Sequence, residues 1–192
     1  DTAGGMVGII LSAGASSRMG QPKALLPLDG APLIHHHIDA LSAICCRIIV
    51  VLGCHTEAIS AVLPEGVESV VNPDWETTGP AESLLCALPV GRPAVVTPVD
   101  VPPAPAWVLT ALKKARRPAV PTFDGQDGHP VIIGTSAASV LADGGTLRTV
   151  LQDAARVPVG WSDAVLNLNT PGQWDAWRGS RAARAGTPPR RR

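Results

Sequence analysis

The stretch Val7-Gly8-Ile9-Ile10-Leu11 leads directly into Ser12-Ala13-Gly14-Ala15-Ser16-Ser17-Arg18-Met19-Gly20-Gln21-Pro22-Lys23. The first five residues form a continuous apolar run that ends in small residues. Such a run is typical of a strand buried on both faces of a parallel sheet, because a half-exposed strand would alternate apolar and polar residues. We therefore expect a buried strand at 7–11 and a loop at 12–23 that is rich in Gly, Ala and Ser.

Strands and helices are expected to alternate beyond this loop. Apolar runs predict strands at 47–52, 67–71, 94–97, 119–122 and 130–133. Local patterns predict helices at 32–41, 57–63, 81–88, 106–115 and 147–154, and a last helix from Pro171 onward. Two further strands are expected at 157–159 and 165–168. This alternation indicates βαβ units around a parallel sheet, and therefore an α/β fold.

The length of 192 residues fits one domain, which we expect to span 1–185, with a basic tail at 186–192. The net charge is zero, but six of the sixteen basic residues lie at 178–192, where there is no acid. The rest of the chain is therefore acidic, whereas a body that binds nucleic acid is expected to be basic. With five Trp, one Phe and no Tyr, the chain also offers few rings for base stacking, so no nucleic-acid partner is expected.

The four cysteines are Cys45, Cys46, Cys54 and Cys86, and none of them has the C-x-x-C spacing of a metal site. We interpret them as buried free thiols, which suit a reducing compartment. The N-terminal apolar run is too short for a signal peptide and lacks a basic flank. No apolar run is long enough to cross a bilayer. The sequence therefore predicts a cytoplasmic protein without a membrane partner.

The loop at 12–23 has the chemistry of a polyphosphate site. Small residues let the backbone approach a phosphate chain, and successive N–H groups can form an anion-binding nest. Arg18 and Lys23 add positive charge. An arginine can bind phosphate with two parallel hydrogen bonds, whereas a lysine acts as a point charge. The spacing from Gly14 to Gly20 is wrong for a Walker A loop, and a G-x-G-x-x-G fingerprint is absent. A phosphate-binding loop of another type is therefore expected.

The loop continues into Ala24-Leu25-Leu26 and then Gly30-Ala31-Pro32-Leu33. The whole pattern resembles L-x-[AG]-G-x-S-x-R-M-G-x-x-K-x-L-L followed by G-x-P-L, the signature of MobA-like nucleotidyltransferases. That family includes enzymes that attach GMP or CMP to molybdopterin. The resemblance implies a Rossmann-like three-layer sandwich with a mostly parallel central sheet, of the nucleotide-diphospho-sugar transferase type. It makes the following residues candidates for binding a nucleoside triphosphate: Leu11, Ala13, Gly14, Ala15, Ser16, Ser17, Arg18 and Lys23.

Asp100 follows a predicted buried strand and lies between Pro98 and Pro102. A carboxylate at a strand end, on the side of the first loop, is well placed for Mg²⁺, which takes one or two carboxylates and substrate phosphate oxygens. Asp100-Val101-Pro102 also resembles the Asp-x-Pro segment with which the family binds Mg²⁺. The alternative is a helix N-cap, which the intervening prolines disfavour. Arg18, Lys23 and Asp100 are the expected catalytic residues, and Asp100 is the expected metal ligand.

Asn72-Pro73 and the segment Gly79-Pro80-Ala81-Glu82-Ser83-Leu84 resemble the family's N-P…G-x-x-x-S-L segment, which lies over the nucleotide. Asn72 and Ser83 are therefore candidates for nucleotide contacts. Ser83 could equally occupy the first turn of a helix without touching a ligand. The family often has a basic residue after S-L, and here that residue is Leu85.

Two segments are expected on the acceptor side. Gly128-His129-Pro130-Val131 resembles the family's G-H-P-[VL], so His129 either donates to an acceptor phosphate or has a structural role. Asn167-Leu168-Asn169-Thr170-Pro171 resembles N-x-N-T-P. Alternation along a strand would place Asn167 and Asn169 on one face, near the metal, the phosphates and the acceptor. Where relatives have D-x-D-T-P, this chain offers only neutral amide oxygens.

These features predict a Mg²⁺-dependent nucleotidyltransferase, in which an acceptor phosphate attacks the α-phosphorus and pyrophosphate leaves. Leu11-Ser12-Ala13-Gly14 is nearer to the A-A-G of family members that use CTP than to the L-A-G-G of those that use GTP, so CTP is slightly favoured. Molybdopterin is the expected acceptor, and a molybdoenzyme or maturation factor is a possible partner. The alternatives are a sugar- or polyol-phosphate nucleotidyltransferase and a non-catalytic accessory protein that binds nucleotide.

Overall fold

The computed structural model describes residues 5–88 and 91–185, with the side chains of 183–185 excepted. The strands of its main sheet are β1 (Met6–Ser12), β4 (Cys45–Leu52), β5 (Glu68–Val71), β6 (Ala94–Pro98), β7 (Ala119–Phe123), β8 (Gln126–Asp127), β9 (Val131–Ile133) and β10 (Ala155–Pro158). The helices are α1 (Leu33–Ser42), α2 (Thr56–Ser60), α3 (Pro80–Leu85), α4 (Ala106–Lys114), α5 (Ala137–Ala142), α6 (Leu147–Val150) and α7 (Pro171–Ala185), with 3-10 turns η1 (Lys23–Leu25) and η2 (Ser162–Val165).

The sheet is mixed but mostly parallel, as the sequence predicts. Its strand order is β10-β7-β9-β6-β1-β4-β5, and β8 pairs with β7 outside that path. β1 is central and runs parallel to both of its neighbours, so that Ile9 lies between Ile49 of β4 and Val96 of β6. β9 is antiparallel to β6 and to β7. The switch in direction falls beside β6, the strand that leads to Asp100.

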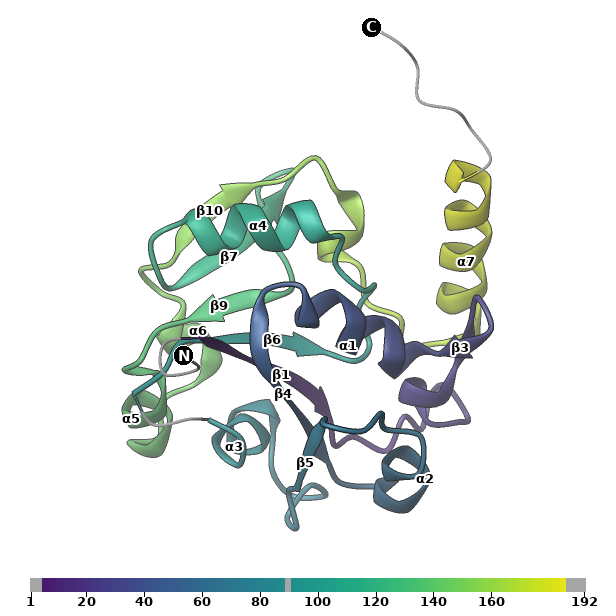
Figure 1. Ribbon diagram of the computed structural model, residues 1–192, viewed down its shortest axis with the longest axis horizontal. Helices are drawn as coiled ribbons and strands as arrows, with labels where there is room; N and C mark the ends of the chain where they lie inside the picture. The colour runs from purple at the N-terminus through teal and green to yellow at the C-terminus, as the bar shows by residue number, and fades with distance from the viewer. Residues whose placement is uncertain (1–4, 89–90, 186–192) are drawn as a thin grey trace, which may run out of the picture.

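Helices cover both faces of the sheet and complete a three-layer sandwich (Figure 1). One core joins the sheet to α1, α2 and α4 and contains Ile10, and the other joins it to α3 and α5 and contains Ile9. Neighbouring residues of β1 thus enter opposite cores, because successive side chains of a strand point to opposite faces. The continuous apolar run at 7–11 is explained by this burial on both sides.

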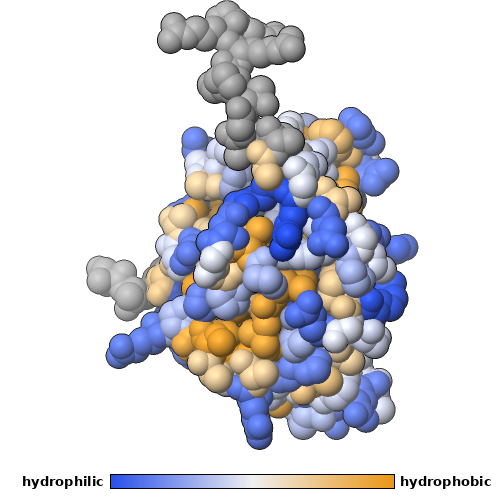
Figure 2. Space-filling view, turned by 90° about the vertical axis from the view of Figure 1, so that its right-hand side faces the viewer, coloured by the Kyte–Doolittle hydropathy of each residue, from blue (hydrophilic) through white to orange (hydrophobic). Residues whose placement is uncertain are grey.

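The last helix, α7, stands at the side of the molecule and does not cover the sheet (Figure 1). It packs into a separate core made of Met19, Leu26, Leu28, Leu33, Leu168, Trp174 and Trp177. This core also includes the hairpin of β2 (Pro27–Leu28) and β3 (Ala31–Pro32), whose turn residues Asp29 and Gly30 both have positive φ. Figure 2 views this side, where beige and pale residues adjoin the upper grey segment and hydrophilic residues in blue lie below them. Because Met19 lies in the same core as Trp174 and Trp177, α7 holds the end of the glycine-rich loop in place.

The predicted strand at 165–168 is wrong. The chain there is the end of η2 followed by an irregular segment. Leu168 turns into the core of α7, and its backbone N–H donates to the Asp100 carbonyl oxygen at 2.6 Å. Leu168 thus serves a local core and not the sheet, whereas Leu166 is exposed.

The predicted helix at 147–154 is shorter than expected and ends at Val150, and Thr146 caps its start. α5 and the short strands β2, β3 and β8 were not predicted. All of them are six residues long or shorter, and so they leave little periodicity in the sequence.

The cysteines are free, as predicted, but the expectation that they are buried is wrong. Cys45 and Cys54 are half-buried, and Cys46 and Cys86 are exposed. Cys45 and Cys46 begin β4, before the fully buried part of that strand. Partial burial still disfavours a thiolate and raises the pKa of Cys45 to about 12.

Within the described ranges, no helix combines the length and the apolar character that a bilayer crossing requires. The predicted basic tail at 186–192 lies outside the described residues.

Candidate functional site

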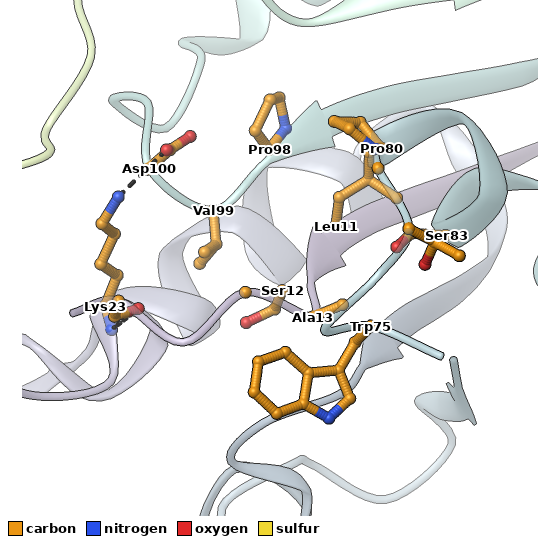
Figure 3. A pocket seen from close by; sticks show the side chains of 14 residues that line it. Leu11, Ser12, Ala13, Lys23, Trp75, Pro80, Ser83, Pro98, Val99 and Asp100 are labelled. Carbon is orange, nitrogen blue, oxygen red and sulfur yellow. Dashed lines mark hydrogen bonds and ion pairs between the residues drawn. The ribbon is translucent and has the colours of Figure 1, made fainter. Parts of the chain in front are cut away.

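A cleft of about 340 Å³ opens at the carboxyl ends of β1 and β6 and beside the start of α3 (Figure 3). Open parallel sheets bind ligands at this edge, because the loops that follow neighbouring strands meet there. The cleft is lined by Leu11, Ser12, Ala13, Gly14, Ser16, Lys23, Trp75, Thr78, Gly79, Pro80, Ser83, Pro98, Val99 and Asp100. The structure thus brings together seven of the residues that the sequence singles out: Leu11, Ala13, Gly14, Ser16, Lys23, Ser83 and Asp100.

The loop after β1 is closed by its own hydrogen bonds. Ser16 has a φ of 54°, and its carbonyl oxygen accepts the N–H of Met19 at 2.9 Å. Its hydroxyl oxygen accepts the backbone N–H of Lys23 at 3.2 Å. Met19 itself is buried in the core of α7. The segment from Ala13 to Lys23 is therefore held at both ends, while Gly14 and Ser16 face the cleft.

The turn after β4 supports this loop from behind. Cys54 donates its backbone N–H to the Ala13 carbonyl oxygen at 3.0 Å, and His55 Nε2 lies 3.0 Å from the Ala15 carbonyl oxygen. A Cβ at Gly53 would lie 2.5 Å from the Ala13 oxygen and 2.7 Å from Cβ of Trp75. Glycine is thus required at 53, because the backbone here passes between two walls of the cleft.

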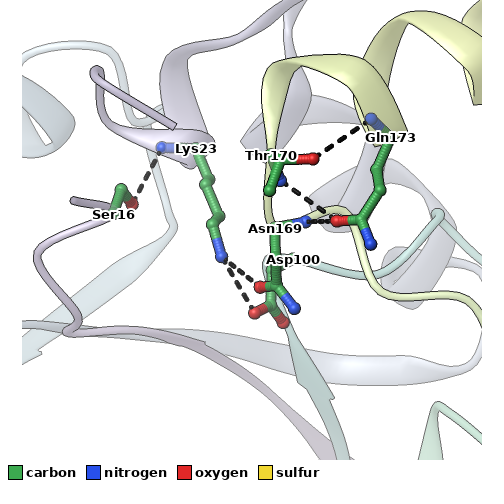
Figure 4. A network of polar contacts seen from close by, with 6 residues as sticks. All are labelled: Ser16, Lys23, Asp100, Asn169, Thr170 and Gln173. Carbon is green, nitrogen blue, oxygen red and sulfur yellow. Dashed lines mark hydrogen bonds and ion pairs between the residues drawn. The ribbon is translucent and has the colours of Figure 1, made fainter. Parts of the chain in front are cut away.

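One end of the cleft is charged (Figure 4). Lys23 Nζ donates to Asp100 Oδ2 at 3.1 Å and to Asn169 Oδ1 at 2.7 Å. The Lys23 side chain is 11% exposed and that of Asp100 is 30% exposed. Gln173 Oε1 accepts the backbone N–H groups of Asn169 and Thr170 at 2.8 and 3.1 Å. Two segments distant from Lys23 therefore converge on its ammonium group.

The opposite end of the cleft is apolar, with hydroxyl groups. The indole of Trp75 lies near Ser12 and Ala13, well away from Lys23 and Asp100 (Figure 3). Sequence analysis did not identify Trp75. The available signal was a tryptophan, in a chain with few aromatic residues, two positions after the Asn72-Pro73 motif.

Asn72 is buried behind the part of the cleft that Trp75 and Ser83 line. Its Nδ2 donates to Thr78 Oγ1 at 2.9 Å and to Ser83 Oγ at 3.0 Å. Its Oδ1 accepts the backbone N–H of Asp74 at 3.0 Å. Asn72 therefore fixes the turn that carries Trp75 and the start of α3 that carries Ser83, without lining the cleft itself.

The remaining residues predicted for nucleotide binding lie on the outer side of the loop. Ala15, Ser17 and Arg18 do not line the cleft, and Ser17 and Arg18 are exposed. Arg18 has no ion pair with any of the described residues. Its long side chain is therefore available to a ligand that projects from the cleft.

The two asparagines predicted for the acceptor side lie apart from each other. Asn169 contacts Lys23, whereas Asn167 is exposed and lines a separate hollow beside Trp177. The two amides do not share a face, because the segment is not a strand. His129 is mostly buried, and its Nδ1 has no hydrogen-bond partner among the described residues. Burial lowers the pKa of His129, although the negative charge of Asp100 opposes that shift.

The donor set at Asp100 fits a hard divalent cation that binds together with a substrate. Among the described residues there is no group of three or more His, Cys, Asp or Glu side chains that could hold a metal ion. A structural zinc site needs four such ligands, whereas Mg²⁺ uses one or two carboxylates and completes its shell with phosphate oxygens and water. One partly exposed carboxylate beside an open cleft meets the second requirement.

The sheet topology and the loop and carboxylate at its carboxyl edge define a Rossmann-like α/β domain of the nucleotide-diphospho-sugar transferase type. Residues 8–157 match the MobA-like NTP transferase domain, and the chain belongs to that family.

Curated relatives match over shorter segments. The bifunctional protein GlmU of Thermotoga maritima is 36% identical over 84 residues, which are 43% of this chain and 18% of that protein. A probable molybdenum cofactor guanylyltransferase of Rhodopirellula baltica is 36% identical over 78 residues, 40% of this chain and 36% of that protein. The chain thus matches well under half of the length of either protein.

Solved structures resemble the whole fold. The crystal structure of Rv0371c from Mycobacterium tuberculosis H37Rv aligns with a TM-score of 0.75 at 22% identity, covering 92% of this chain and 99% of that one. A complex of that protein with manganese aligns with a TM-score of 0.69 at 21% identity, covering 92% of this chain and 99% of that one.

Proposed function

We propose that this chain is a metal-dependent nucleotidyltransferase that moves a nucleoside monophosphate from a triphosphate to a phosphorylated acceptor. The observation that carries the proposal is the pairing of Lys23 with Asp100 at the end of a cleft whose floor is the small-residue loop. A cation and a metal-binding carboxylate at one point suit a polyphosphate with its Mg²⁺. Family membership supports the same reaction class.

The two ends of the cleft orient the nucleotide. We place the triphosphate at the end with Lys23 and Asp100, with the backbone at Gly14 and Ser16 along it. The base and ribose then lie toward Trp75 and Ser83, where a ring and a hydroxyl group are available. An apolar pocket with a few polar groups is the usual form of a small-molecule site.

Catalysis is proposed to rest on position and charge, without a covalent enzyme intermediate. Lys23 and the loop N–H groups hold the leaving pyrophosphate, and the exposed Arg18 guanidinium closes over its outer oxygens. Asp100 would hold Mg²⁺, which supplies further neutralisation of the phosphate charge. Manganese, found with Rv0371c, would serve in the same place.

The acceptor is proposed to approach past Asp100 from the side of His129. His129 supports this direction, because its imidazole is close enough to Asp100 for the carboxylate charge to act on its pKa. Asn169 borders the same end of the cleft, whereas Asn167 would touch only a large acceptor that extends over the start of α7. A phosphorylated pterin such as molybdopterin fits the family relationship, and a molybdoenzyme or maturation factor in the cytoplasm would receive the product.

The test combines binding with turnover. Calorimetric titration with ATP, GTP, CTP and UTP in Mg²⁺ should show one preferred base, and we expect CTP from the Leu11-Ser12-Ala13-Gly14 start of the loop. Metal-dependent pyrophosphate release should then require either molybdopterin or a sugar or polyol phosphate. Binding of a triphosphate without pyrophosphate release in the presence of every acceptor would favour an accessory protein. Failure to bind any triphosphate would refute the proposal.

A further inference from the structure

We infer that Asn169 is a positioning residue that keeps the Lys23 ammonium in place when a divalent cation takes the Asp100 carboxylate. The inference rests on the proposed function and gives the last helix a part in the active site. It starts from the two contacts of Lys23, of which the one to the neutral amide is the shorter, at 2.7 Å against 3.1 Å.

The Lys23 ammonium needs a partner at all times, because its side chain is almost wholly enclosed. An ammonium group that is buried without a hydrogen-bond partner is strongly disfavoured. A divalent cation at Asp100 would compete with Lys23 for the same carboxylate and would repel it. Lys23 therefore has to shift its hydrogen bonding away from Asp100 when the metal binds.

An amide oxygen suits this exchange. It accepts a hydrogen bond from the ammonium but carries no charge, so it attracts a divalent cation much less than a carboxylate does. Asn169 thus lets the carboxylate and the lysine separate while both stay at the end of the cleft. Without Asn169, metal binding would leave Lys23 with neither of its observed side-chain partners.

Asn169 is itself held in place by the start of α7. Gln173 accepts the N–H groups of Asn169 and Thr170, and the hydroxyl oxygen of Thr170 accepts the N–H of Gln173 at 3.3 Å. The neighbouring Leu168 and Trp174 are buried in the core of α7. The position of the amide therefore depends on how the start of this helix is capped (Figure 4).

The experiment measures Mn²⁺ binding without nucleotide, by electron paramagnetic resonance and by calorimetry. Asn169→Leu should raise the dissociation constant of Mn²⁺ about tenfold, since Lys23 in this variant keeps Asp100 as its partner without metal but loses its last side-chain partner when the metal binds. Gln152→Leu, the same amide-to-leucine change on an exposed surface, should leave it unchanged. Asp100→Asn should abolish binding and so shows that the signal comes from this site.

If circular dichroism shows that Asn169→Leu does not fold, a second pair of variants tests the inference. Gln173→Leu removes the acceptor that holds Asn169 and should weaken Mn²⁺ in the same direction, by a few-fold. Gln173→Glu keeps an acceptor oxygen and should restore the affinity. The inference is overturned if Asn169→Leu is folded and binds Mn²⁺ as the unaltered chain does. If Asn169→Leu is not folded, the same result with Gln173→Leu overturns it. In both cases the proposed function stands. If the unaltered chain binds no Mn²⁺, the metal site and the inference both fail.

Discussion

Lys23 reaches Asp100 across 77 positions of sequence, and the two were singled out by separate local signals. Lys23 ends a small-residue loop, and Asp100 ends a buried strand. Their meeting follows from the topology, because β1 and β6 are parallel neighbours and the segments after them emerge at one edge. The N-x-N-T-P motif pointed to Asn169, but not to its hydrogen bond with Lys23, and no motif pointed to Trp75.

Lys23→Ala should lower the rate of nucleotidyl transfer by about 10³-fold or more, as the loss of a cation that stabilises transferring phosphoryl groups does. Pyrophosphate release under saturating substrate measures the effect. Lys113→Ala removes a lysine from α4 and is the control. Near-normal release by Lys23→Ala would show that Lys23 does not contact the phosphates.

Trp75→Ala should weaken triphosphate binding about tenfold, because stacking of a base on an aromatic ring is worth roughly 1–3 kcal/mol. Trp75→Phe keeps a ring and should lose less. Calorimetric titration checks both variants, with Trp107→Ala as the control, since Trp107 is 52% exposed on α4. Equal affinity of Trp75→Ala and the unaltered chain would place the base elsewhere.

At the scale of elements, long buried segments were predictable and short ones were not. β1, β4 and β6 carry apolar runs that only a covered strand explains. The segment at 165–168 is also mostly apolar, but only its Leu168 is buried, against α7, and periodicity in four residues cannot separate these two cases. Some of the hydrogen bonds that shape the cleft walls join turns far apart in the sequence, such as those that Cys54 and His55 make to the loop at Ala13 and Ala15.

The turn after β4 gives a prediction at this scale. In Gly53→Ala, the new Cβ would overlap the carbonyl oxygen of Ala13 and the Cβ atom of Trp75. Both walls of the cleft must then shift, which should cost about 1–3 kcal/mol of unfolding free energy and weaken triphosphate binding. Urea denaturation and calorimetry measure the two effects.

Gly134→Ala is the control for this prediction, since no atom lies within 4 Å of the place that its new Cβ would occupy, and Gly134 does not line the cleft. If Gly53→Ala matched this control in both stability and affinity, the close contact of the three segments would not matter for the site.

The molecule as a whole is held by two cores on the faces of the sheet and a third under α7. His37 of α1 is fully enclosed, and its Nε2 has no hydrogen-bond partner among the described residues. Burial lowers the pKa of His37 to about 4, chiefly because a charged imidazole is poorly solvated there. Acid is therefore expected to lower the stability of the fold through this side chain.

Between pH 6.5 and pH 4 the unfolded chain binds a proton at His37 that the folded chain does not. Stability should therefore fall on acidification through this window, by about 1.4 kcal/mol for each pH unit and by about 3 kcal/mol in all. Urea unfolding of metal-free protein across this range measures the slope. His37→Phe should flatten it by one proton, and an identical slope in both proteins would contradict the assignment.

The sequence by itself determined the α/β class, the buried central strand, the small-residue loop that follows it and the carboxylate beyond a strand end, because each is written in contiguous residues. Tertiary structure decided that Asn169 contacts Lys23 while Asn167 does not, that Asn72 supports the cleft from behind, and that Trp75 forms its far wall. Those features depend on segments that only chain folding brings together, so no local pattern of residues could specify them.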